Sequence, residues 1–184
     1  MALRGRAGLT SSRIFLKKSS FFAALLFAGL VSAKEGSKNA LVDQLRGVRA
    51  GGFEYAHYDT EGRMQWKVSS KGSFFEQDLS LRLIQPVLTM LAESGPATLS
   101  SAEAHLKREE QWIQMSGNVS AINFHGVDLQ SGRLAVDMTK KMLTFSEHFF
   151  IQRALMQVEG EQGSYDGEKG ILSVDGHSIT EIRP

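Results

Sequence analysis

The sequence contains Trp112-Ile113-Gln114-Met115-Ser116-Gly117-Asn118-Val119, and the pattern of this stretch returns twice at a nearly constant interval. The second copy is Met142–Phe149 and the third is Ile171–Ser178. Each copy follows a polar turn, and the three turns are residues 107–110, 137–140 and 166–169. Recurrence at a fixed period indicates one unit stacked on itself, because a single unit cannot bury its apolar face alone. The pattern therefore predicts an extended scaffold with a long core or groove, not a compact enzyme with one pocket.

Alternation of apolar and polar residues indicates that the stacked units are strands. Trp66 and Val68 alternate with polar neighbours, which is typical of a half-buried strand. Phe53–Tyr58 and Arg63–Ser70 flank a turn and are predicted to form a hairpin. Residues 99–111 have some helical propensity, but their alignment with the repeat favours strands. We therefore predict an all-β domain of stacked antiparallel strands.

Two other features set the expected path of the chain. Eighteen glycines and three prolines suit a meander of short strands joined by tight turns. Pro86 cannot donate a hydrogen bond to a neighbouring strand, so a strand is expected to bend or end there. Leu41, Val42, Leu45 and Val48 have helical spacing, which predicts a short amphipathic helix within a linker over residues 34–52.

Strand register predicts one continuous apolar strip. Side chains two residues apart lie on the same face of a strand, and stacked strands repeat about every 4.8 Å. The apolar residues expected on the shared inner face are Trp66, Val68, Leu81, Leu83, Val87, Ile113, Met115, Val119, Leu143, Phe145, Phe149, Leu172 and Val174. Two interpretations remain open at this point: the strip is the closed core of a sandwich, or it is an open trough for an apolar ligand.

Residues 1–33 are typical of a targeting segment. They carry five basic residues and no acidic one, and they end in the apolar run Phe21–Ala33. This run is shorter than the roughly 20 residues of a membrane-spanning helix, and its small residues Val31-Ser32-Ala33 suit signal peptidase. An uncleaved anchor remains open if residues 14–16 extend the span while Lys17 and Lys18 snorkel. A buried helix of the folded domain is the third possibility. Export of residues 53–184 is expected from the first two.

Composition excludes several classes of function. The chain has no cysteine, so disulfides and thiolate metal sites are excluded. Five of its 21 basic residues lie within positions 1–33, so the rest of the chain, with all 20 acidic residues, is mildly acidic. Nucleic-acid binding requires clustered Lys and Arg, and we therefore expect no nucleic-acid partner.

Candidate catalytic or metal-binding residues are few. His148 and His177 occupy equivalent repeat positions, but two imidazoles without a third ligand make a weak zinc site. His57 near Asp59 fits a solvated pair better than an acid–base pair, and Glu109-Glu110 fits a hairpin tip. No nucleophile elbow, phosphate loop or metalloprotease motif is present. We therefore expect a protein that is not an enzyme and has no cofactor or metal.

Three short segments resemble the LptC-like and LptA-like (OstA-like) periplasmic proteins of lipopolysaccharide export. Phe53–Ser70, with Tyr58-Asp59-x-x-Gly62 and Trp66-x-Val68, looks like the opening of the LptC-like domain. Leu83–Thr89 is similar to a later family segment, and Met115–Val119 matches a unit shared by both branches. The resemblance runs from Phe53 to Ile182. It implies a β-jellyroll ("β-taco") over residues 53–184 with an open apolar groove, preceded by an N-terminal signal or anchor helix.

The resemblance also implies a function. Such a protein receives lipopolysaccharide from an inner-membrane ABC transporter complex, holds its acyl chains in the groove, and passes them to a periplasmic LptA-like protein. The apolar strip, apart from Val87, would line the groove. Partners would add as strands at two edges, because unpaired strand edges invite β-augmentation. The residues expected at these edges are Phe53, Tyr55, His57, Ile171, Ser173 and Ile179. The expected location is the periplasm, with a possible inner-membrane anchor.

Three alternatives remain open. The short, cleavable-looking apolar run permits a soluble, LptA-like role in place of the LptC-like one. A structural or adhesive envelope β-solenoid would have a closed core and no lipid cargo. An envelope hydrolase would act on glycans through acids such as Asp59 and Glu61.

Overall fold

The computed structural model describes residues 12–14, 49–76, 80–92 and 95–182. The predicted helix at residues 41–48 lies outside these residues. So does all of the predicted signal or anchor segment except Ser12–Ile14, which forms a short strand. Among the described residues no helix is long and apolar enough to cross a membrane.

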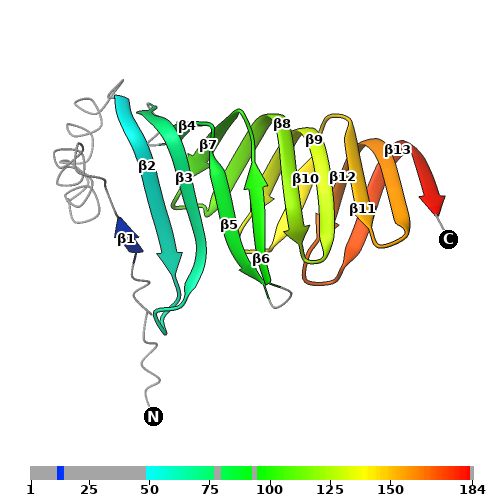
Figure 1. Cartoon of the computed structure of the whole chain (residues 1–184), viewed down its shortest axis with the longest axis horizontal. Coiled ribbons are helices and arrows are strands. Elements are labelled where there is room, and N and C mark those ends of the chain that lie inside the picture. Colours follow the sequence, from blue (N-terminus) through cyan, green and yellow to red (C-terminus); the bar gives the residue numbers. More distant parts are fainter. Residues whose placement is uncertain (1–11, 15–48, 77–79, 93–94, 183–184) are drawn as a thin grey trace, which may run out of the picture.

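The described part of the chain consists of strands that follow one another along the long axis of the molecule (Figure 1). The first seven strands are β1 (Ser12–Ile14), β2 (Arg49–Tyr58), β3 (Met64–Phe75), β4 (Leu81–Ile84), β5 (Val87–Ala92), β6 (Gly95–Ser100) and β7 (Glu103–Lys107). The remaining strands are β8 (Trp112–Phe124), β9 (Val127–Asp137), β10 (Met142–Phe145), β11 (Phe149–Arg153), β12 (Met156–Asp166) and β13 (Ile171–Ile182). Every pairing is antiparallel, so the predicted all-β class is confirmed.

The strands form two layers that share their long members. β3, β8, β9 and β12 each pair with one set of short strands at one end and another set at the other end. Layer A contains β4, β7 and β10 with the adjoining halves of the long strands, and layer B contains β5, β6 and β11 with the other halves. We call one passage of the chain through both layers a rung. β4 with β5, β7 with β6, and β10 with β11 each form a single rung that is interrupted at the boundary between the layers.

Each rung bends where it passes from one layer to the other, and these bends explain the repeat. Successive bends are almost evenly spaced along the chain, near Pro86, Ala102, Gly117, Gly132 and Glu147. Two successive rungs fill one period, so the repeating unit is one pair of antiparallel rungs. The polar turns predicted before each repeat copy are present at the far ends of the rungs in layer A, close to the predicted positions.

Local backbone geometry produces the bend in β8. Gly117 and Asn118 both adopt positive φ angles, 76° and 49°, and the register of β8 against β9 shifts between Ser116 and Val119. Asn tolerates this left-handed region better than most residues do. A Cβ on Gly117 would lie 2.9 Å from the Cβ of Ala102, which is the neighbouring bend. The glycine therefore allows two rungs to bend side by side.

The bend at Pro86 reverses one prediction. Val87 was expected on the inner face, but it is 37% exposed, whereas Leu88 is fully buried. Gln85 has a positive φ of 49° and Pro86 separates β4 from β5, so the alternation of the chain is offset by one residue at this bend. A one-residue offset moves each later side chain to the opposite face. The expected hairpin of β2 and β3, and the strands within residues 99–111, are present.

Candidate functional site: the interior between the two layers

The interior is a continuous apolar cluster that runs between the two layers. All the groove residues predicted up to Phe149 are buried, with at most 2% of their surface exposed. They are Trp66, Val68, Leu81, Leu83, Ile113, Met115, Val119, Leu143, Phe145 and Phe149. In the structure these residues form a closed core, which differs from the open apolar groove that the resemblance implied.

The strip is less covered at its C-terminal end. Leu172 and Val174 of β13 pack against the cluster but are only partly buried. They belong to the last rung, and no further strand lies beyond β13 among the described residues. The apolar strip thus reaches the end of the described sheet without a polar cap.

Many interior residues were absent from the sequence prediction. They include Leu88, Leu99, Leu106, Phe124, Leu129, Leu134 and Val136. Most lie on the rungs between the repeat copies, whose antiparallel direction places their apolar residues on the same inner face. Apolar and polar residues alternate in these rungs too, for example at Leu134 and Val136. This alternation is the sequence signal that could have identified the missing interior residues.

The mouth of the interior is the side opposite the bends, where the rungs end in turns. Arg108, in the turn after β7, places its guanidinium carbon 5.8 Å from the centre of the Tyr55 ring. Arg108 belongs to layer A and Tyr55 to layer B, so this cation–π contact bridges the layers. Burial lowers the pKa of Arg108 below its ordinary value, but the guanidinium remains charged.

A second bridge lies nearer the C-terminal end. The Tyr165 hydroxyl of β12 donates to the backbone carbonyl of His125, in the turn between β8 and β9, at 3.5 Å. The Tyr165 ring also meets Phe124 edge-on, with 6.1 Å between ring centres. Burial raises the pKa of Tyr165, so the phenol keeps its donor proton. Both bridges are side-chain contacts, and no pairing between described strands crosses the mouth.

The N-terminal end of the interior is aromatic. Trp66 stacks on His57 with 5.5 Å between ring centres, and it lies 5.2 Å from Tyr55. The buried Trp66 indole N–H finds no hydrogen-bond acceptor in the described residues. Burial lowers the pKa of His57, and the charge of Asp59 opposes this only in part. His57 is therefore a neutral ring against Trp66 near neutral pH.

Asp59 acts as a turn cap. Its Oδ1 accepts from the backbone amides of Glu61 and Arg63, both at 2.9 Å, and its Oδ2 accepts from the Arg63 guanidinium. The Arg63 amide, first among these partners, lowers the pKa of Asp59. These contacts explain the carboxylates at this turn without a hydrolase site. Glu109 and Glu110 lie in the turn between β7 and β8, as expected.

The two histidines of the weak zinc hypothesis do not share a rung pair. His148 Nε2 lies 3.1 Å from Glu159 Oε1, whereas His177 lies on β13, on the far side of β12. No group of three potential metal ligands occurs in the part of the chain that the structure describes.

The two predicted partner edges differ from each other, because in the described part of the chain β2 has a paired strand on both sides and β13 on one side only. Phe53 and Tyr55 of β2 pair with β3 and point into the core, while Ser12–Ile14 pairs with Tyr55–His57 on the other side of β2. β13 pairs with β12 only, so its outer edge faces no strand among the described residues. Ile171, Ser173 and Ile179 of β13 are all exposed.

Comparison with known proteins assigns the family. A model of the family described as lipopolysaccharide-assembly, LptC-related, matches residues 21–178. The chain belongs to this family. Its members, like those of the LptA family, are periplasmic components of lipopolysaccharide transport and are not known as enzymes. No curated protein matches the chain.

A solved structure shows the same fold. The chain is similar to LptH from Pseudomonas aeruginosa, the LptA-homologous periplasmic component of the lipopolysaccharide transport device. The TM-score is 0.54 at 12% identity, over 65% of this chain and 95% of LptH. The LptC-related chain thus has the LptA-like β-jellyroll that the sequence resemblance implied.

Proposed function

We propose that this LptC-related chain holds the acyl chains of lipopolysaccharide between layers A and B. It receives the lipid from the inner-membrane ABC transporter complex and passes it to a periplasmic LptA-like protein. The observation that carries the proposal is the uninterrupted apolar strip from Trp66 to Val174, with its end uncapped at β13 among the described residues. Burial of acyl chains is worth about 0.8 kcal/mol per methylene, which such a strip supplies without hydrogen bonds.

The mouth supports entry of lipid from the side. Among the described residues it is bridged by side-chain contacts, at Arg108–Tyr55 and Tyr165–His125, whereas hydrogen-bonded strands run through the bends. Separation of the layers would therefore break side-chain contacts at the mouth, while the rungs would flex at their bends. Lipid would replace the contacts that the two apolar faces lose with each other.

The uncapped end supports transfer to the next protein. β13 offers an edge that no described strand covers, and Leu172 and Val174 offer an apolar continuation of the strip. A strand of an LptA-like partner added to β13 would extend both the sheet and the interior. If the N-terminal segment is an anchor whose span begins at residues 14–16, Ser12–Ile14 would not pair with β2. The β2 edge would then also be available.

A photo-crosslinking experiment in cells tests the cargo. A photoreactive phenylalanine analogue at Phe145, which points inward, should capture lipopolysaccharide. The same analogue at Thr144, the exposed neighbour on the outer face, should not. Circular dichroism of both purified variants verifies that they fold. A folded Phe145 variant without lipid adduct would count against the proposal, as would equal adducts at both positions.

The dense closed interior favours one second candidate, a structural or adhesive β-solenoid without cargo. Extraction and mass spectrometry of protein purified from the envelope separate the two candidates. A carrier should retain lipid, whereas a closed structural core should carry none.

A further inference from the structure

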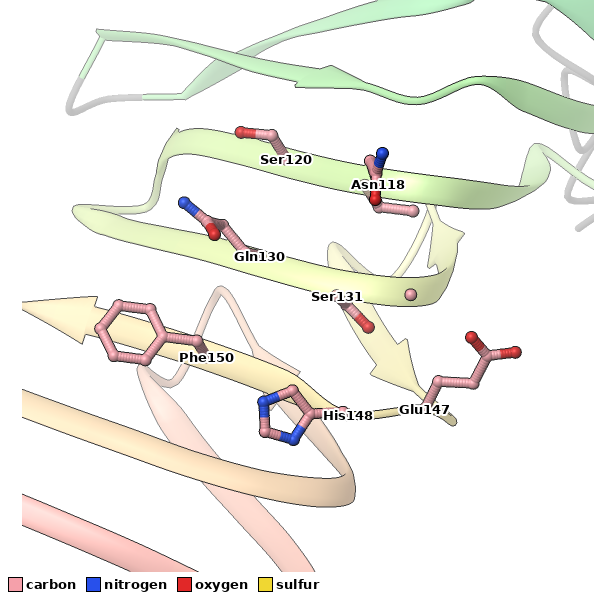
Figure 2. A pocket seen from close by; sticks show the side chains of 9 residues that line it. Asn118, Ser120, Gln130, Ser131, Glu147, His148 and Phe150 are labelled. Carbon is pink, nitrogen blue, oxygen red and sulfur yellow. The ribbon is translucent and has the colours of Figure 1, made fainter.

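The outer face of layer B contains a pocket that the apolar interior does not explain. Its volume is about 550 Å³, within the range of small-molecule sites. The pocket lies over β8, β9 and the start of β11 (Figure 2), where the outward residues Ser120, Gln130 and Phe150 alternate with core residues. The residues that line it are Asn118, Val119, Ser120, Gln130, Ser131, Gly132, Glu147, His148 and Phe150.

Strand register builds the floor of the pocket. Ser120 of β8 pairs with Gln130 of β9, and Gln130 pairs with Phe150 of β11, so the three side chains form a row across neighbouring strands. Val119 and Phe149, their inward neighbours, are buried in the core. The floor is therefore fixed by the same alternation that fixes the core.

The bends supply the wall. Glu147 lies over Gly132, where a Cβ would collide with its carboxylate, and its Oε1 is 3.5 Å from Arg133 Nε. His148 is held at the rim by Glu159, 3.1 Å away. On the other side, Asn118, whose φ is positive, also lines the pocket (Figure 2). The wall thus combines an amide, a carboxylate and an imidazole.

The chemistry of this pocket suits a saccharide. The side chains of Asn118, Ser120 and Gln130 form no hydrogen bond with any described residue, so their donors and acceptors are available. Amides that both donate and accept match vicinal hydroxyls, and the Phe150 ring offers an apolar surface for the C–H face of a pyranose. Glu147 can accept from hydroxyls but repels anions.

The strand surface around the pocket is also mostly uncharged. Within strands β5, β6, β8, β9 and β11 the outward residues of layer B are uncharged except for Asp128, which accepts from the Asn123 amide at 2.8 Å. The carboxylates close to the pocket are Glu147 in its wall and Glu159 at its rim. The uncharged outward residues are Val87, Thr89, Leu91, Pro96, Thr98, Ser100, Ser120, Ile122, Gln130, Phe150 and Gln152. By contrast, the outer face of layer A carries the Arg82–Glu103 ion pair and Arg133. A neutral glycan would therefore meet little electrostatic desolvation cost on the floor of the pocket, which Ser120, Gln130 and Phe150 form.

We propose that this pocket binds one saccharide unit of an uncharged glycan, with the sugar ring against Phe150 and its hydroxyls on Asn118, Ser120 and Gln130. The site lies outside the interior, so the proposal goes beyond the lipid-carrying function and does not depend on it. The sugar could belong to the saccharide portion of a glycolipid or to a free envelope glycan. Both sources present pyranose rings with vicinal hydroxyls.

Titration of the folded chain with two probes tests the proposal and distinguishes the sources. The probes are a neutral N-acetylglucosamine tetramer and a neutral O-chain oligosaccharide of lipopolysaccharide that carries no phosphate or acidic sugar, and binding is followed by amide NMR shifts. At least one probe should bind saturably, with shifts at Asn118 and Gln130. Gln130→Ala and Phe150→Ala should each weaken binding about fivefold or more, the effect of losing one good contact.

Matched controls lie on the outer face of layer A. Gln114→Ala removes an amide there, and Thr144→Ala an exposed hydroxyl; both should leave the affinity unchanged. Absence of saturable binding by both probes would overturn the proposal, and so would binding that Gln130→Ala and Phe150→Ala leave intact. Lipid capture at Phe145 is read separately, so failure here leaves the lipid-carrying function standing.

Discussion

Two aspartates cap equivalent turns of the repeat by the same contacts. Asp137 Oδ1 accepts from the amides of Thr139 and Lys140 at 3.1 and 2.9 Å, and Asp166 Oδ1 accepts from the amides of Glu168 and Lys169, both at 3.0 Å. Each carboxylate also pairs with the lysine three residues later, at 3.0 and 2.9 Å. The spacing Asp-x-x-Lys therefore encodes a turn that closes on itself.

These contacts predict an acid-dependent loss of stability. For Asp166 the Lys169 side chain and amide lower the pKa; for Asp137 burial acts in the opposite direction, but its contacts with Lys140 outweigh it. A carboxyl with a lowered folded pKa stabilises the fold above its unfolded pKa, near 4, and loses this contribution as the pH falls through the folded pKa. The double variant Asp137→Asn/Asp166→Asn should thus be less stable than the parent at pH 7.

Denaturant unfolding between pH 7 and pH 2 measures this difference. The gap between parent and double variant should shrink as the pH falls, because protonation removes the same charges in the parent. Asp175→Asn, at an exposed position of β13, serves as the control for loss of a surface carboxylate and should change the stability at pH 7 little. A gap that stays constant down to pH 2 would contradict the assignment.

Among the strands, β4 and β5 show how an interrupted rung changes which residues face inward. Gln85 and Pro86 connect them, and the backbone amide of Gln85 donates to the carbonyl of Ala102 at 2.8 Å, in the neighbouring bend. This contact holds two interrupted rungs together where no ladder pairing is possible. As a result Leu88, and not Val87, continues the inner face.

Substitution of these two neighbours tests the offset at the bend. Leu88→Ala should lower the free energy of unfolding by about 2–4 kcal/mol, since it leaves a cavity in a fully buried site. Val87→Ala should cost less than about 0.5 kcal/mol, as expected for a surface position. Urea unfolding followed by Trp fluorescence measures both. Equal losses would mean that both residues face inward.

The last strand, β13, combines an edge that no described strand covers with an apolar inner face formed by Leu172 and Val174. Two further apolar residues of this strand are exposed, Ile179 at 58% and Ile171 at 53%. Natural edge strands usually carry charges or bulges that prevent pairing. β13 has a register shift opposite Glu161, but on either side of it the edge is a regular strand.

A charge on the inner face of this strand should block addition of a partner. In Val174→Lys the ammonium group would be buried when the next strand extends the interior, and we expect at least a tenfold loss of affinity for the LptA-like partner. Asp175→Lys places the same charge on the outward, exposed position and should change the affinity little. Co-purification and titration with the partner compare the two variants. An undiminished affinity of Val174→Lys would exclude β13 as the joining edge.

Across the described residues, the two layers are joined by hydrogen-bonded strands at the bends and by side-chain contacts at the mouth. The bends lie within hydrogen-bonded strands, whereas the mouth is held by Arg108 against Tyr55 and by Tyr165 against His125. This asymmetry permits the layers to part on one side only. In the proposed lipid-carrying function, the layers would open at the mouth without a change in strand order.

A reversible cross-link across the mouth tests whether opening is required. The chain has no cysteine, so Tyr55→Cys/Arg108→Cys can be linked specifically by a short, reducible bifunctional thiol reagent. Linked protein should lose lipid uptake several-fold, and reduction should restore it, because the layers can no longer separate near this bridge. Purified lipopolysaccharide with crosslinking at Phe145 provides the readout.

The control pair lies within one layer. Arg82 and Glu103 form an ion pair across neighbouring strands of layer A at 2.8 Å, so Arg82→Cys/Glu103→Cys links two positions that stay together when the mouth opens. Uptake by this linked control should equal that of the unlinked protein. Full uptake by the protein linked at positions 55 and 108 would show that lipid enters elsewhere.

The strand class, the period of the repeat and most of the inner face were predictable from local pattern. Alternation identifies which side chains share a face, so Ile113, Met115 and Phe145 were correctly placed inward. Recurrence at a fixed period identified the unit, although it did not reveal that the unit is a pair of rungs. Val87 was misplaced because a single left-handed residue at Gln85 offsets the alternation without altering the apolar pattern.

Contacts between residues far apart in the sequence could not be predicted from alternation or from the repeat. Arg108 meets Tyr55, and Asn118, Gln130 and Phe150 share one pocket, only because the rungs bend at matching places and stack in register. Local sequence determines how each rung alternates and where it turns, since those preferences depend on near neighbours. Which residues meet across the mouth or along the outer face depends on the packing of one layer against another, and only the folded chain decides it.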